Sequence, residues 1–309
     1  MEQNSIDIVI VNWNAGDLLS RCVGSLLKTQ SVKLIGKIII VDNASSDSSV
    51  SEVAVSEKIH WIKNTENRGF SVACNQGFRA ASAPYVLLLN PDAAVFDVTL
   101  EACLKFMNGR KDIDILGCRL VNDEGKTTVS CARFPTPWRY CTDAIGISKL
   151  FPKLFPPATL MTDWNHLESK EVDQVMGAFM LIRKSTLSAM NGFDERFFVY
   201  YEELDFSKRV SEQKGKIFFN ADIKALHSGG GTTCAVKAFR LYLSLSSRLH
   251  YARKHFSAIG YGVTWLSTYL VEPWTRMLFC FVKADLTGIT QVWNGYYLLI
   301  SKGKKERFT

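Results

Sequence analysis

The sequence lacks the cysteine pattern and the leader segment that mark exported proteins. Its 309 residues include eight cysteines, but no two of them form a CxxC pair and their spacing is irregular. A disulfide framework or a zinc site would need regular spacing. The first residues, MEQNSIDIVIVNWN, contain no basic segment followed by a long apolar one, so they do not predict a secretory signal peptide. We therefore expect reduced cysteines and a cytoplasmic protein.

Long uninterrupted apolar runs are also missing. The most apolar stretch near the end, residues 261–282, is broken in its middle by Glu272 and Arg276, whereas a membrane-spanning helix needs ~20 apolar residues. No segment repeats at a fixed period, which argues against a solenoid. No GxGxxG segment follows the first apolar run, Ile6–Val11, and this absence argues against a dinucleotide-binding dehydrogenase.

Excess positive charge is missing from most of the chain. Residues 1–236 hold 26 Lys and Arg against 27 Asp and Glu, whereas residues 237–309 hold 11 against 3, so the net charge of +7 resides in the last segment. A nucleic-acid-binding protein more often carries basic residues on its main domain, with motifs for base stacking or groove entry. None is present, so we expect the basic tail to meet an anionic membrane or a lipid-linked phosphate and no nucleic acid.

Short apolar runs alternate with helical patterns from the start of the chain. Ile6–Val11 and Lys37–Val41 are rich in β-branched residues, which is typical of strands buried on both faces of a parallel sheet. Asp17–Thr29 lies between them and repeats its apolar residues at helical spacing. Since parallel strands need a crossover, this order predicts a β-α-β unit. Similar patterns predict strands at Ile59–Lys63, Tyr85–Leu89, Ile113–Leu120, Thr127–Cys131, Val175–Ile182, Lys216–Phe219 and Ile223–Leu226, and helices at Ser71–Ala81, Glu202–Gln213, Lys237–Phe256 and Tyr261–Val282.

The predicted elements indicate an α/β domain with a Rossmann-like, mixed and mostly parallel sheet flanked by helices, followed by a helical C-terminal extension. Phe134–Pro157 is rich in Pro, Gly and aromatic residues and is predicted to be a long loop. The extension, residues 237–309, is basic and rich in aromatic residues. Its helices either associate with a membrane interface or cover one edge of the domain.

Polar clusters directly follow four of the predicted strands, and open α/β sheets bind their ligands at these strand ends. These clusters are Val11-Asn12-Trp13-Asn14, Val41-Asp42-Asn43-Ala44-Ser45-Ser46-Asp47, Asn67-Arg68-Gly69-Phe70 with Asn75, and Leu89-Asn90-Pro91-Asp92. Further motifs lie farther along the chain: Gly177-Ala178-Phe179-Met180-Leu181-Ile182-Arg183, Gly192-Phe193-Asp194-Glu195, Tyr201-Glu202-Glu203-Leu204-Asp205 with Arg209, and His227 with the glycines after it.

Together, these motifs resemble those of family 2 glycosyltransferases with the GT-A fold, over residues 6 to about 255. Within that family the resemblance is closest to bacterial rhamnosyltransferases that build surface polysaccharides. It implies a GT-A domain at residues 1–236, with a nucleotide-sugar half at about 1–95 and an acceptor half at about 96–236, before the extension at 237–309. It also implies substrate contacts by a set of polar residues: Asn12, Asn14, Asp42, Asn67, Arg68, Asn75, Asn90, Asp205 and Arg209.

Asp42 ends the second predicted strand. A carboxylate at that position can accept a hydrogen bond from the N–H of a pyrimidine base, and the resemblance makes Asp42 the base-reading aspartate. The alternative is an Asx turn or a helix cap that opens the serine-rich segment after it. Arg68 either binds a phosphate through its planar guanidinium group or lies solvated on the surface.

Asn90-Pro91-Asp92 occupies the place of the family's Asp-x-Asp motif. A nucleoside diphosphate brings several negative charges to one spot, so a divalent cation held by few carboxylates and by phosphate oxygens is the expected arrangement. The resemblance makes Asp92 the direct ligand of Mg²⁺ or Mn²⁺ and gives His227 a metal or pyrophosphate contact. Asn90 replaces the first aspartate of the motif, which lowers the charge of the site.

Attack at an anomeric carbon needs a base for the proton of the acceptor hydroxyl. By resemblance, Glu203 matches the second acid of the family's Glu-Asp motif, although a glutamate here replaces the aspartate, and Glu202 is the alternative base. A charged helix face is the other interpretation of these acids. Asp205 and Arg209 lie four residues apart on the predicted helix, and a pair between them would make Arg209 structural.

We therefore expect an inverting glycosyltransferase that moves L-rhamnose from dTDP-L-rhamnose onto a lipid-linked saccharide in surface polysaccharide (O-antigen) synthesis. We expect it to act as a peripheral protein at the inner face of the cell membrane. UDP-galactofuranose and UDP-N-acetylglucosamine are alternative donors within the same family. A further alternative is a nucleotide-sugar-binding protein without catalysis, because Asn90 and Glu203 depart from the commonest motif letters.

Overall fold

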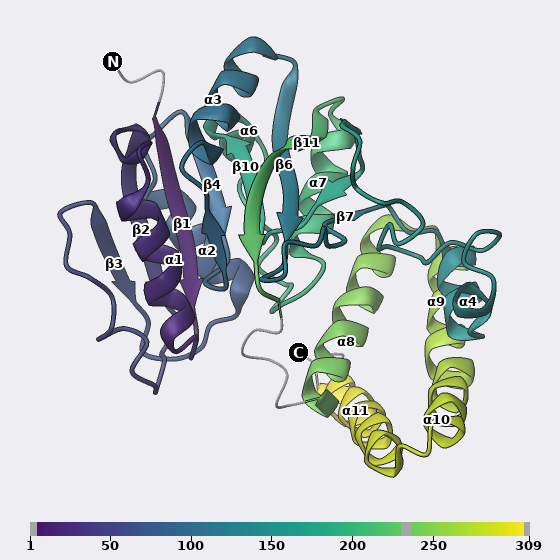
Figure 1. The fold of residues 1–309 in the computed structure, drawn as a ribbon. Coiled ribbons are helices and arrows are strands. Elements are labelled where there is room, and N and C mark those ends of the chain that lie inside the picture. The colour runs from purple at the N-terminus through teal and green to yellow at the C-terminus, as the bar shows by residue number, and fades with distance from the viewer. Residues whose placement is uncertain (1–4, 230–236, 306–309) are drawn as a thin grey trace. The chain divides into compact units, whose positions relative to one another are not determined.

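The computed structural model describes residues 5–229 and 237–305, which separate into two units (Figure 1). The first unit holds residues 5–132, 165–198 and 202–229, and the second holds residues 133–164, 199–201 and 237–305. Residues 133–164 fall within the predicted acceptor half of the first domain, but they belong to the second unit together with the C-terminal helices.

The first unit is built around a mixed β-sheet. Its strands are β1 (Ile6–Asn12), β2 (Ile35–Asp42), β3 (Ile59–Lys63), β4 (Tyr85–Leu89), β5 (Ala93–Val95), β6 (Ile113–Val121), β8 (Lys170–Glu171), β10 (Phe179–Arg183) and β11 (Lys216–His227). They lie in the order β3-β2-β1-β4-β10-β6-β11-β5, with β8 beside β11. Figure 1 shows β3, β2, β1 and β4 from left to right. β3, β2, β1, β4, β6 and β11 run in one direction, and β10, β5 and β8 run in the opposite one. A separate two-stranded ribbon pairs β7 (Cys131–Ala132) with β9 (Gln174–Val175).

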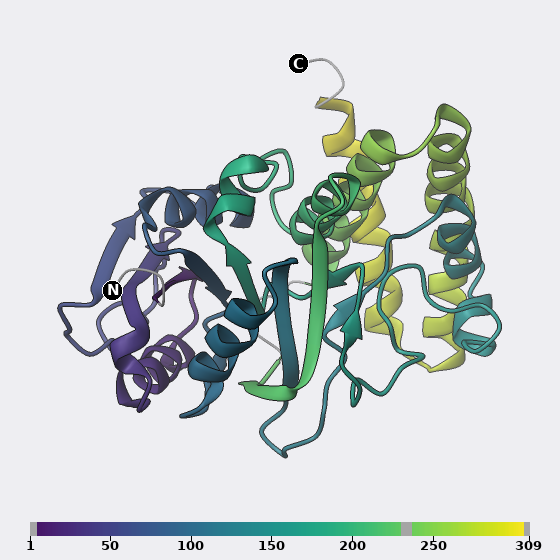
Figure 2. The ribbon, with the colours of Figure 1, turned by 90° about the horizontal axis from the view of Figure 1, so that it is seen from above.

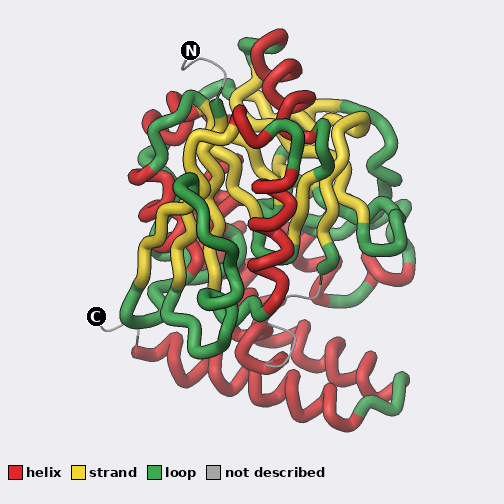
Figure 3. The backbone as a smooth tube through the Cα atoms, turned by 60° about the vertical axis from the view of Figure 1, so that its left-hand side comes forward, coloured by secondary structure: helices red, strands yellow, loops and turns green. Residues whose placement is uncertain are grey.

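Helices cover both faces of this sheet (Figure 3). They are α1 (Asp17–Lys28), the 3₁₀ turn η2 (Val32–Leu34), α2 (Phe70–Ala80), α3 (Thr99–Gly109), α6 (Lys184–Ala189) and α7 (Glu202–Glu212). Side chains of β1 alternate between the faces. Ile6 and Ile8 join the core that contains Leu19 of α1, whereas Val9 lies on the other face, so close to Gly77 of α2 that a Cβ there would overlap it. The prediction of a mixed, mostly parallel sheet flanked by helices is confirmed.

Strand β11 merges two predicted strands and contains a bulge. Its register with β6 shifts between Asn220 and Lys224, whose partners Cys118 and Arg119 are consecutive residues, so residues 221–223 have no partners on β6. The Asn220 side chain closes the bulge, because its Oδ1 accepts a hydrogen bond from the Asp222 N–H at 2.9 Å. The strand then continues to His227 and pairs with β5.

The second unit is helical. Its helices are α4 (Pro137–Ala144), α5 (Ile147–Leu150), α8 (Lys237–His255), α9 (Ala258–Leu266), the π-helical turn η3 (Ser267–Val271), α10 (Glu272–Val282) and α11 (Leu286–Lys305). Figure 2 shows the C-terminal helices, coloured green to yellow, side by side. Tyr242 and Leu245 of α8 pack with Tyr296 and Leu299 of α11 to form its apolar core.

The prediction of a long loop at Phe134–Pro157 is wrong, since α4 and α5 lie within it. Thr136 caps α4 by accepting the Arg139 N–H at its side-chain oxygen, and Pro137 occupies the first turn, where a missing N–H costs nothing. Gly146 then adopts a left-handed φ of 81° and turns the chain into α5. The Thr-Pro pair is therefore a helix-start signal within a segment whose composition is typical of loops.

The predicted C-terminal helices are present, and α11 follows them without having been predicted. Lys237–Phe256 corresponds to α8, and Tyr261–Val282 corresponds to α9, η3 and α10 together. Gly288 and Gly295 lower the intrinsic helix propensity of α11, which forms because its buried face packs against α8. None of the helices in the described ranges combines the length and the apolar composition needed to cross a bilayer.

The described cysteines agree with the prediction of reduced thiols. All of those within residues 5–229 and 237–305 are free, and most are buried in the core. Cys234 lies outside the described residues. The buried ones are Cys22, Cys74, Cys103, Cys118 and Cys131.

Candidate active site

The carboxyl ends of β1 and β2 bring Asn12 and Asp42 side by side, since these residues are register partners. Both side chains are buried. Asn12 Nδ2 donates to Asp42 Oδ1 at 2.8 Å and to Ser49 Oγ at 2.9 Å, while the Ser45 N–H donates to Asp42 Oδ2 at 3.2 Å. The Asx-type turn that the sequence left open is therefore present. It holds the Asp42 carboxylate at the edge of the sheet.

The loop after β1 is tied to the loop after β2. Asn14 adopts a positive φ of 52°, and its N–H donates to Ser45 Oγ at 3.0 Å. Asn14 Oδ1 accepts the Ser46 N–H at 2.8 Å, and Asp47 Oδ2 accepts the Gly16 N–H at 2.8 Å. These contacts fix the two loops as one surface, with Asn14 next to the Asp42 turn.

Asn43 is the centre of the next part of this edge, and sequence reasoning assigned it no role. Its Nδ2 donates to Asn67 Oδ1 at 2.8 Å, and its Oδ1 accepts the Arg68 N–H at 3.1 Å. Its position directly after Asp42 was the available signal. The Arg68 side chain is exposed on the loop that Asn43 holds, where it is accessible to a ligand.

Gly69 joins this loop to the segment that leads into α7. Its φ is +85°, and a Cβ would lie 2.7 Å from the Phe198 carbonyl oxygen, so only glycine fits without strain. The Phe70 N–H donates to the same Phe198 oxygen at 2.6 Å. The Asn67–Gly69 loop therefore lies against the segment five residues before Glu203.

Asn75 is directed to a different part of the unit. Its Nδ2 donates to the Phe193 carbonyl at 2.8 Å and to Glu195 Oε1 at 3.0 Å, and its Oδ1 accepts the Phe193 N–H at 2.8 Å. The side chain is buried. These contacts occupy the Asn75 amide group and hold the Gly192–Glu195 segment in place, so Asn75 has a structural role.

Asp205 and Arg209 form the ion pair that the helical spacing predicted. Arg209 Nε donates to Asp205 Oδ2 at 2.9 Å, and its two terminal nitrogens donate to the carbonyls of Met190 and Gly192 at 2.7 and 2.8 Å. Asp205 is fully buried. All three guanidinium nitrogens donate to protein groups, so the pair has a structural role.

Asp92 and His227 meet because β5 pairs antiparallel with β11, with Ala93 opposite His227. Asp92 Oδ1 lies 3.3 Å from His227 Nε2, and their side chains keep 10% and 18% of their surface exposed. The Asn90 carbonyl accepts the Ala93 N–H at 3.1 Å, which makes a tight turn through Asp92. Gly230 and Gly231, which belong to the motif that begins at His227, lie outside the described residues.

A divalent cation fits this pair if substrate supplies most of its ligands. Residues 5–229 and 237–305 contain no group of three or more His, Cys, Asp or Glu side chains arranged around a common point. Asp92 offers a carboxylate oxygen and His227 an imidazole nitrogen, and Mg²⁺ or Mn²⁺ bound to a diphosphate needs only one or two protein ligands. Asn90 adds an amide side chain that is partly exposed at the same turn.

Glu203 lies in the first turn of α7, against the backbone of Gly177. Its carboxylate lies so close to Gly177 that a Cβ at position 177 would overlap Glu203 Oε1. Burial raises the pKa of Glu203 above the ordinary glutamate value, although the nearby backbone N–H groups of Glu203 and Gly177 oppose the shift. Gly177 belongs to the Gly177–Arg183 motif of the sequence, but its contact with Glu203 is seen only in the structure.

Glu203 and Asp92 lie at the same edge of the sheet. Leu89 of β4 is opposite Phe179 of β10, and the Asn90 N–H donates to the Ala178 carbonyl at 3.2 Å. The turn that carries Asp92 therefore runs beside the Gly177 backbone on which Glu203 rests. Glu202, the alternative base, is 2% exposed, whereas Glu203 is partly exposed and so better able to meet an acceptor.

Known proteins are similar in sequence to the part of the chain that carries this site. The family model described as Glycosyl transferase family 2 matches residues 7–187. A low-salt glycan biosynthesis hexosyltransferase of Haloferax volcanii, Agl10, is 25% identical over 89% of this chain and 85% of its own length. An N-acetylglucosaminyl-diphospho-decaprenol L-rhamnosyltransferase of Mycobacterium tuberculosis is 24% identical over 74% of this chain and 77% of its own.

A solved structure shares the fold. The mannosyltransferase PcManGT of Pyrobaculum calidifontis, in complex with GDP-Man and Mn²⁺, superposes with a TM-score of 0.54 over 97% of this chain and 82% of its own, at 13% identity.

Proposed function

Because this chain belongs to glycosyl transferase family 2 and is a glycosyltransferase, we propose that it transfers L-rhamnose from dTDP-L-rhamnose to a lipid-linked saccharide with inversion at the anomeric carbon. One observation carries the proposal: Asp92 and Glu203, the two carboxylates that the chemistry needs, lie at one edge of the sheet. The mycobacterial rhamnosyltransferase supports the sugar and the lipid-linked acceptor.

Glu203 is the proposed base of the transfer. It takes the proton of the acceptor hydroxyl as that oxygen bonds to the anomeric carbon, and the bond from that carbon to the diphosphate breaks on the opposite face of the sugar. The leaving group is dTDP. The raised pKa of Glu203, caused by burial, makes its carboxylate a better proton acceptor than an exposed glutamate.

Asp92 and His227 are the proposed holders of a divalent cation. Such an ion, when bound, neutralises the charge that develops on the leaving diphosphate. Arg68, exposed on the loop held by Asn43, is positioned to bind a phosphate through its guanidinium group. Asp42 is proposed to accept the ring N–H of the pyrimidine base, with Asn12 and Asn14 fixing its geometry.

A UDP-sugar, either UDP-galactofuranose or UDP-N-acetylglucosamine, is the second candidate donor. Uracil and thymine present the same ring N–H, and the Asp42 carboxylate is an acceptor for either of them. The two bases differ by a methyl group, whose burial is worth only about 1–3 kcal/mol of discrimination. The donor preference therefore has to be measured directly.

We expect dTDP-L-rhamnose to bind tightly with Mg²⁺ or Mn²⁺ and weakly after chelation with EDTA, and transfer to require the ion. Asp92→Asn removes the anionic ligand and is expected to weaken metal-dependent donor binding by roughly 100-fold, since one such contact is worth several kcal/mol. Isothermal titration against dTDP-, UDP- and GDP-sugars measures both effects.

Asp97→Asn is the matched control for this titration, because Asp97 is an exposed aspartate five residues farther along. Tight binding of a UDP-sugar with no binding of dTDP-L-rhamnose would replace the proposed donor. Donor binding without transfer to any lipid-linked saccharide would support the alternative of a non-catalytic binding protein.

The C-terminal helices support a peripheral position at the inner face of the cell membrane, which we propose with the cytoplasmic location. Exposed apolar side chains recur at helical spacing along α9, η3 and α10, and a second set follows on α11, within a segment that carries 11 Lys and Arg against 3 Asp and Glu. An apolar face with basic surroundings is typical of helices bound to anionic lipid. The exposed residues are Ile259, Val263, Leu266, Leu270, Trp274, Leu278, Phe281, Leu286, Trp293, Tyr297 and Ile300.

Replacing Trp274 and Leu278 together by serine is expected to abolish most binding to anionic vesicles. Each side chain is more than half exposed, and inserting a large apolar side chain into lipid contributes about 1.5–3 kcal/mol. Vesicle flotation measures the bound fraction. Val98→Ser, at a position of the first unit with the same 67% exposure as Trp274, should leave flotation unchanged. Equal flotation of the double variant and the unaltered protein would contradict the proposal.

A further inference from the structure

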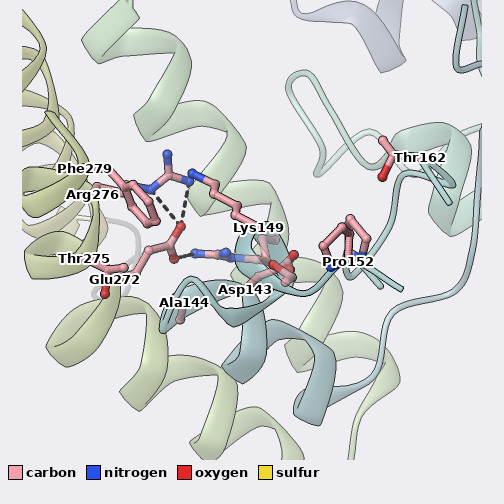
Figure 4. A pocket seen from close by; sticks show the side chains of 12 residues that line it. Asp143, Ala144, Lys149, Pro152, Thr162, Glu272, Thr275, Arg276 and Phe279 are labelled. Atoms are coloured by element: carbon pink, nitrogen blue, oxygen red, sulfur yellow. Dashed lines mark hydrogen bonds and ion pairs between the residues drawn. The ribbon is translucent and has the colours of Figure 1, made fainter. Parts of the chain in front are cut away.

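The second unit contains a pocket of about 400 Å³ that takes no part in the site described above. It is an open pocket lined by residues of α4, α5, α8 and α10 and of the segment after α5 (Figure 4). Figure 4 shows Arg276 and Glu272 on one side and Thr162 and Pro152 on the other. The lining also includes Asp143, Lys149, Arg248, Thr275 and Phe279.

A buried charge network forms the floor of this pocket. Glu272 Oε1 accepts from Arg276 Nε at 2.8 Å and from Arg276 Nη2 at 2.7 Å, and Glu272 Oε2 accepts from Arg248 Nη2. The side chains of Arg248 and Glu272 are only 8% and 6% exposed. Two guanidinium groups thus share one carboxylate, which leaves one positive charge in excess.

Two of the residues that line the pocket each have a buried polar atom without a hydrogen-bond partner in the described chain. Arg248 Nε is buried and has no hydrogen-bond partner in the described chain, and the same holds for Asp143 Oδ1. Asp143 Oδ2 accepts the Ala158 N–H at 2.9 Å. An unpaired buried donor and an unpaired buried acceptor are both costly.

Lys149 adds a third cation at the rim. It is exposed, it lies 4.7 Å from the centre of the Phe279 ring, and it makes no salt bridge within the described part of the chain. Across the whole lining, Lys149, Arg248 and Arg276 face Asp143 and Glu272. The pocket is therefore net positive. A phosphate ester matches it, because it carries negative charge and several acceptor oxygens that guanidinium and ammonium groups bind.

The helix that supplies the pocket also carries an exposed apolar face. Thr275, Arg276 and Phe279 of α10 line the pocket, while Trp274 and Leu278 of the same helix are 67% and 61% exposed. A lipid can therefore place its charged head group in the pocket and its hydrocarbon chain along the neighbouring apolar face. A free sugar phosphate would use only the first of them.

We infer that this pocket binds the phosphate or diphosphate head of a lipid, whose hydrocarbon chain lies along the apolar face of α10. The inference rests on the proposed function, because it assigns a binding place to the lipid carrier of the acceptor saccharide. A bilayer phospholipid presents the same phosphate chemistry. The experiment below separates these two sources.

Farnesyl diphosphate is a water-soluble probe for the carrier, and vesicles with or without phosphatidylglycerol are the probe for bilayer phospholipid. We expect the full-length protein to bind farnesyl diphosphate more tightly than either farnesol or inorganic pyrophosphate in titration calorimetry. Lys149→Gln should weaken this binding about fivefold, the effect typical of one lysine near an anionic lipid phosphate. Lys153→Gln, an exposed lysine outside the lining, should leave it unchanged.

A loss confined to phosphatidylglycerol vesicles in Lys149→Gln would assign the pocket to bilayer phospholipid, within the same inference. The inference would be overturned if Lys149→Gln and the unaltered protein bound both probes equally well. It would also be overturned if the unaltered protein bound farnesol as tightly as farnesyl diphosphate. Binding of dTDP-L-rhamnose is measured in the same samples without acceptor. Intact donor binding together with failure of the lipid probes would reject the pocket and leave the proposed function standing.

Discussion

Glutamine in place of Glu203 is expected to lower turnover by roughly 100- to 10,000-fold, the range typical for loss of a general base. The substitution keeps the shape of the side chain, so glutamine can occupy the same place against Gly177. Donor binding should persist, because Asp92 and Asp42 are unchanged. The measurement is the rate of sugar transfer at saturating donor and acceptor.

The same variant makes a prediction about stability and pH. The folded-state pKa of Glu203 is raised by burial, so the carboxylate destabilises the fold as pH rises through that value and has no such effect when protonated at lower pH. Glu203→Gln removes the ionisation. Its melting temperature should therefore equal that of the unaltered protein in acid and be at least as high in neutral buffer.

Two further substitutions on α7 make the Glu203 experiment decisive. Glu212→Gln changes a glutamate whose side chain is 52% exposed on the same helix, and it should leave both turnover and melting temperature unchanged. Glu202→Gln tests the alternative base. Loss of turnover in Glu202→Gln with near-normal turnover in Glu203→Gln would transfer the catalytic role to Glu202.

Removing the Glu272 carboxylate is expected to destabilise the second unit by about 3–5 kcal/mol, which is the cost typical of breaking a buried ion pair at one partner. Glu272→Gln leaves the buried Arg248 guanidinium group without its counter-charge. Arg276→Gln should cost only up to about 1 kcal/mol, because Arg276 is 38% exposed and its loss leaves Glu272 paired with Arg248. Chemical denaturation of the three proteins gives this order.

The stabilisation of the fold by the Glu272 carboxylate is expected to decrease as pH falls. Burial by itself would raise the pKa of Glu272, but the Arg248 and Arg276 charges outweigh it and lower the pKa below the ordinary glutamate value. The carboxylate therefore stabilises the fold above the ordinary pKa, and this contribution is lost as pH falls through the lowered one. The difference between Glu272→Gln and the unaltered protein should shrink in acid. An undiminished difference there would contradict the ion-pair explanation.

The sheet of the first unit was predictable because its strands carry unambiguous patterns. Ile6–Val11 and Tyr85–Leu89 are continuous apolar runs, and Asp17–Thr29 has one apolar face at helical spacing, so local pattern and tertiary burial agree. α11 was missed because its glycines and polar residues give a weak local signal, and packing against α8 stabilises it. A tertiary contact of this kind is not visible in a local window.

The strand-end rule located the polar residues of the site but did not separate ligand contacts from scaffolding. It brought Asn12, Asp42 and Asp92 to one edge, as the registers show. It could not show that Arg209 donates to the backbone carbonyls of Met190 and Gly192. These two residues lie outside the predicted helix that carries Arg209, so the helical pattern does not reveal the contact. The pocket of the second unit was equally hidden, because Lys149 and Glu272 are far apart in sequence.

The bulge in β11 limits the insertions and deletions that related sequences can tolerate in this strand. Residues 221–223 add three positions between the two paired stretches of the strand that ends at His227, whose Nε2 lies 3.3 Å from Asp92 Oδ1. Losing one residue there would shift the parity of everything after it, so that His227 would face the opposite side of the sheet. Natural length variation is therefore expected to be excluded from this short segment, whose Ala221 and Ile223 side chains are also buried.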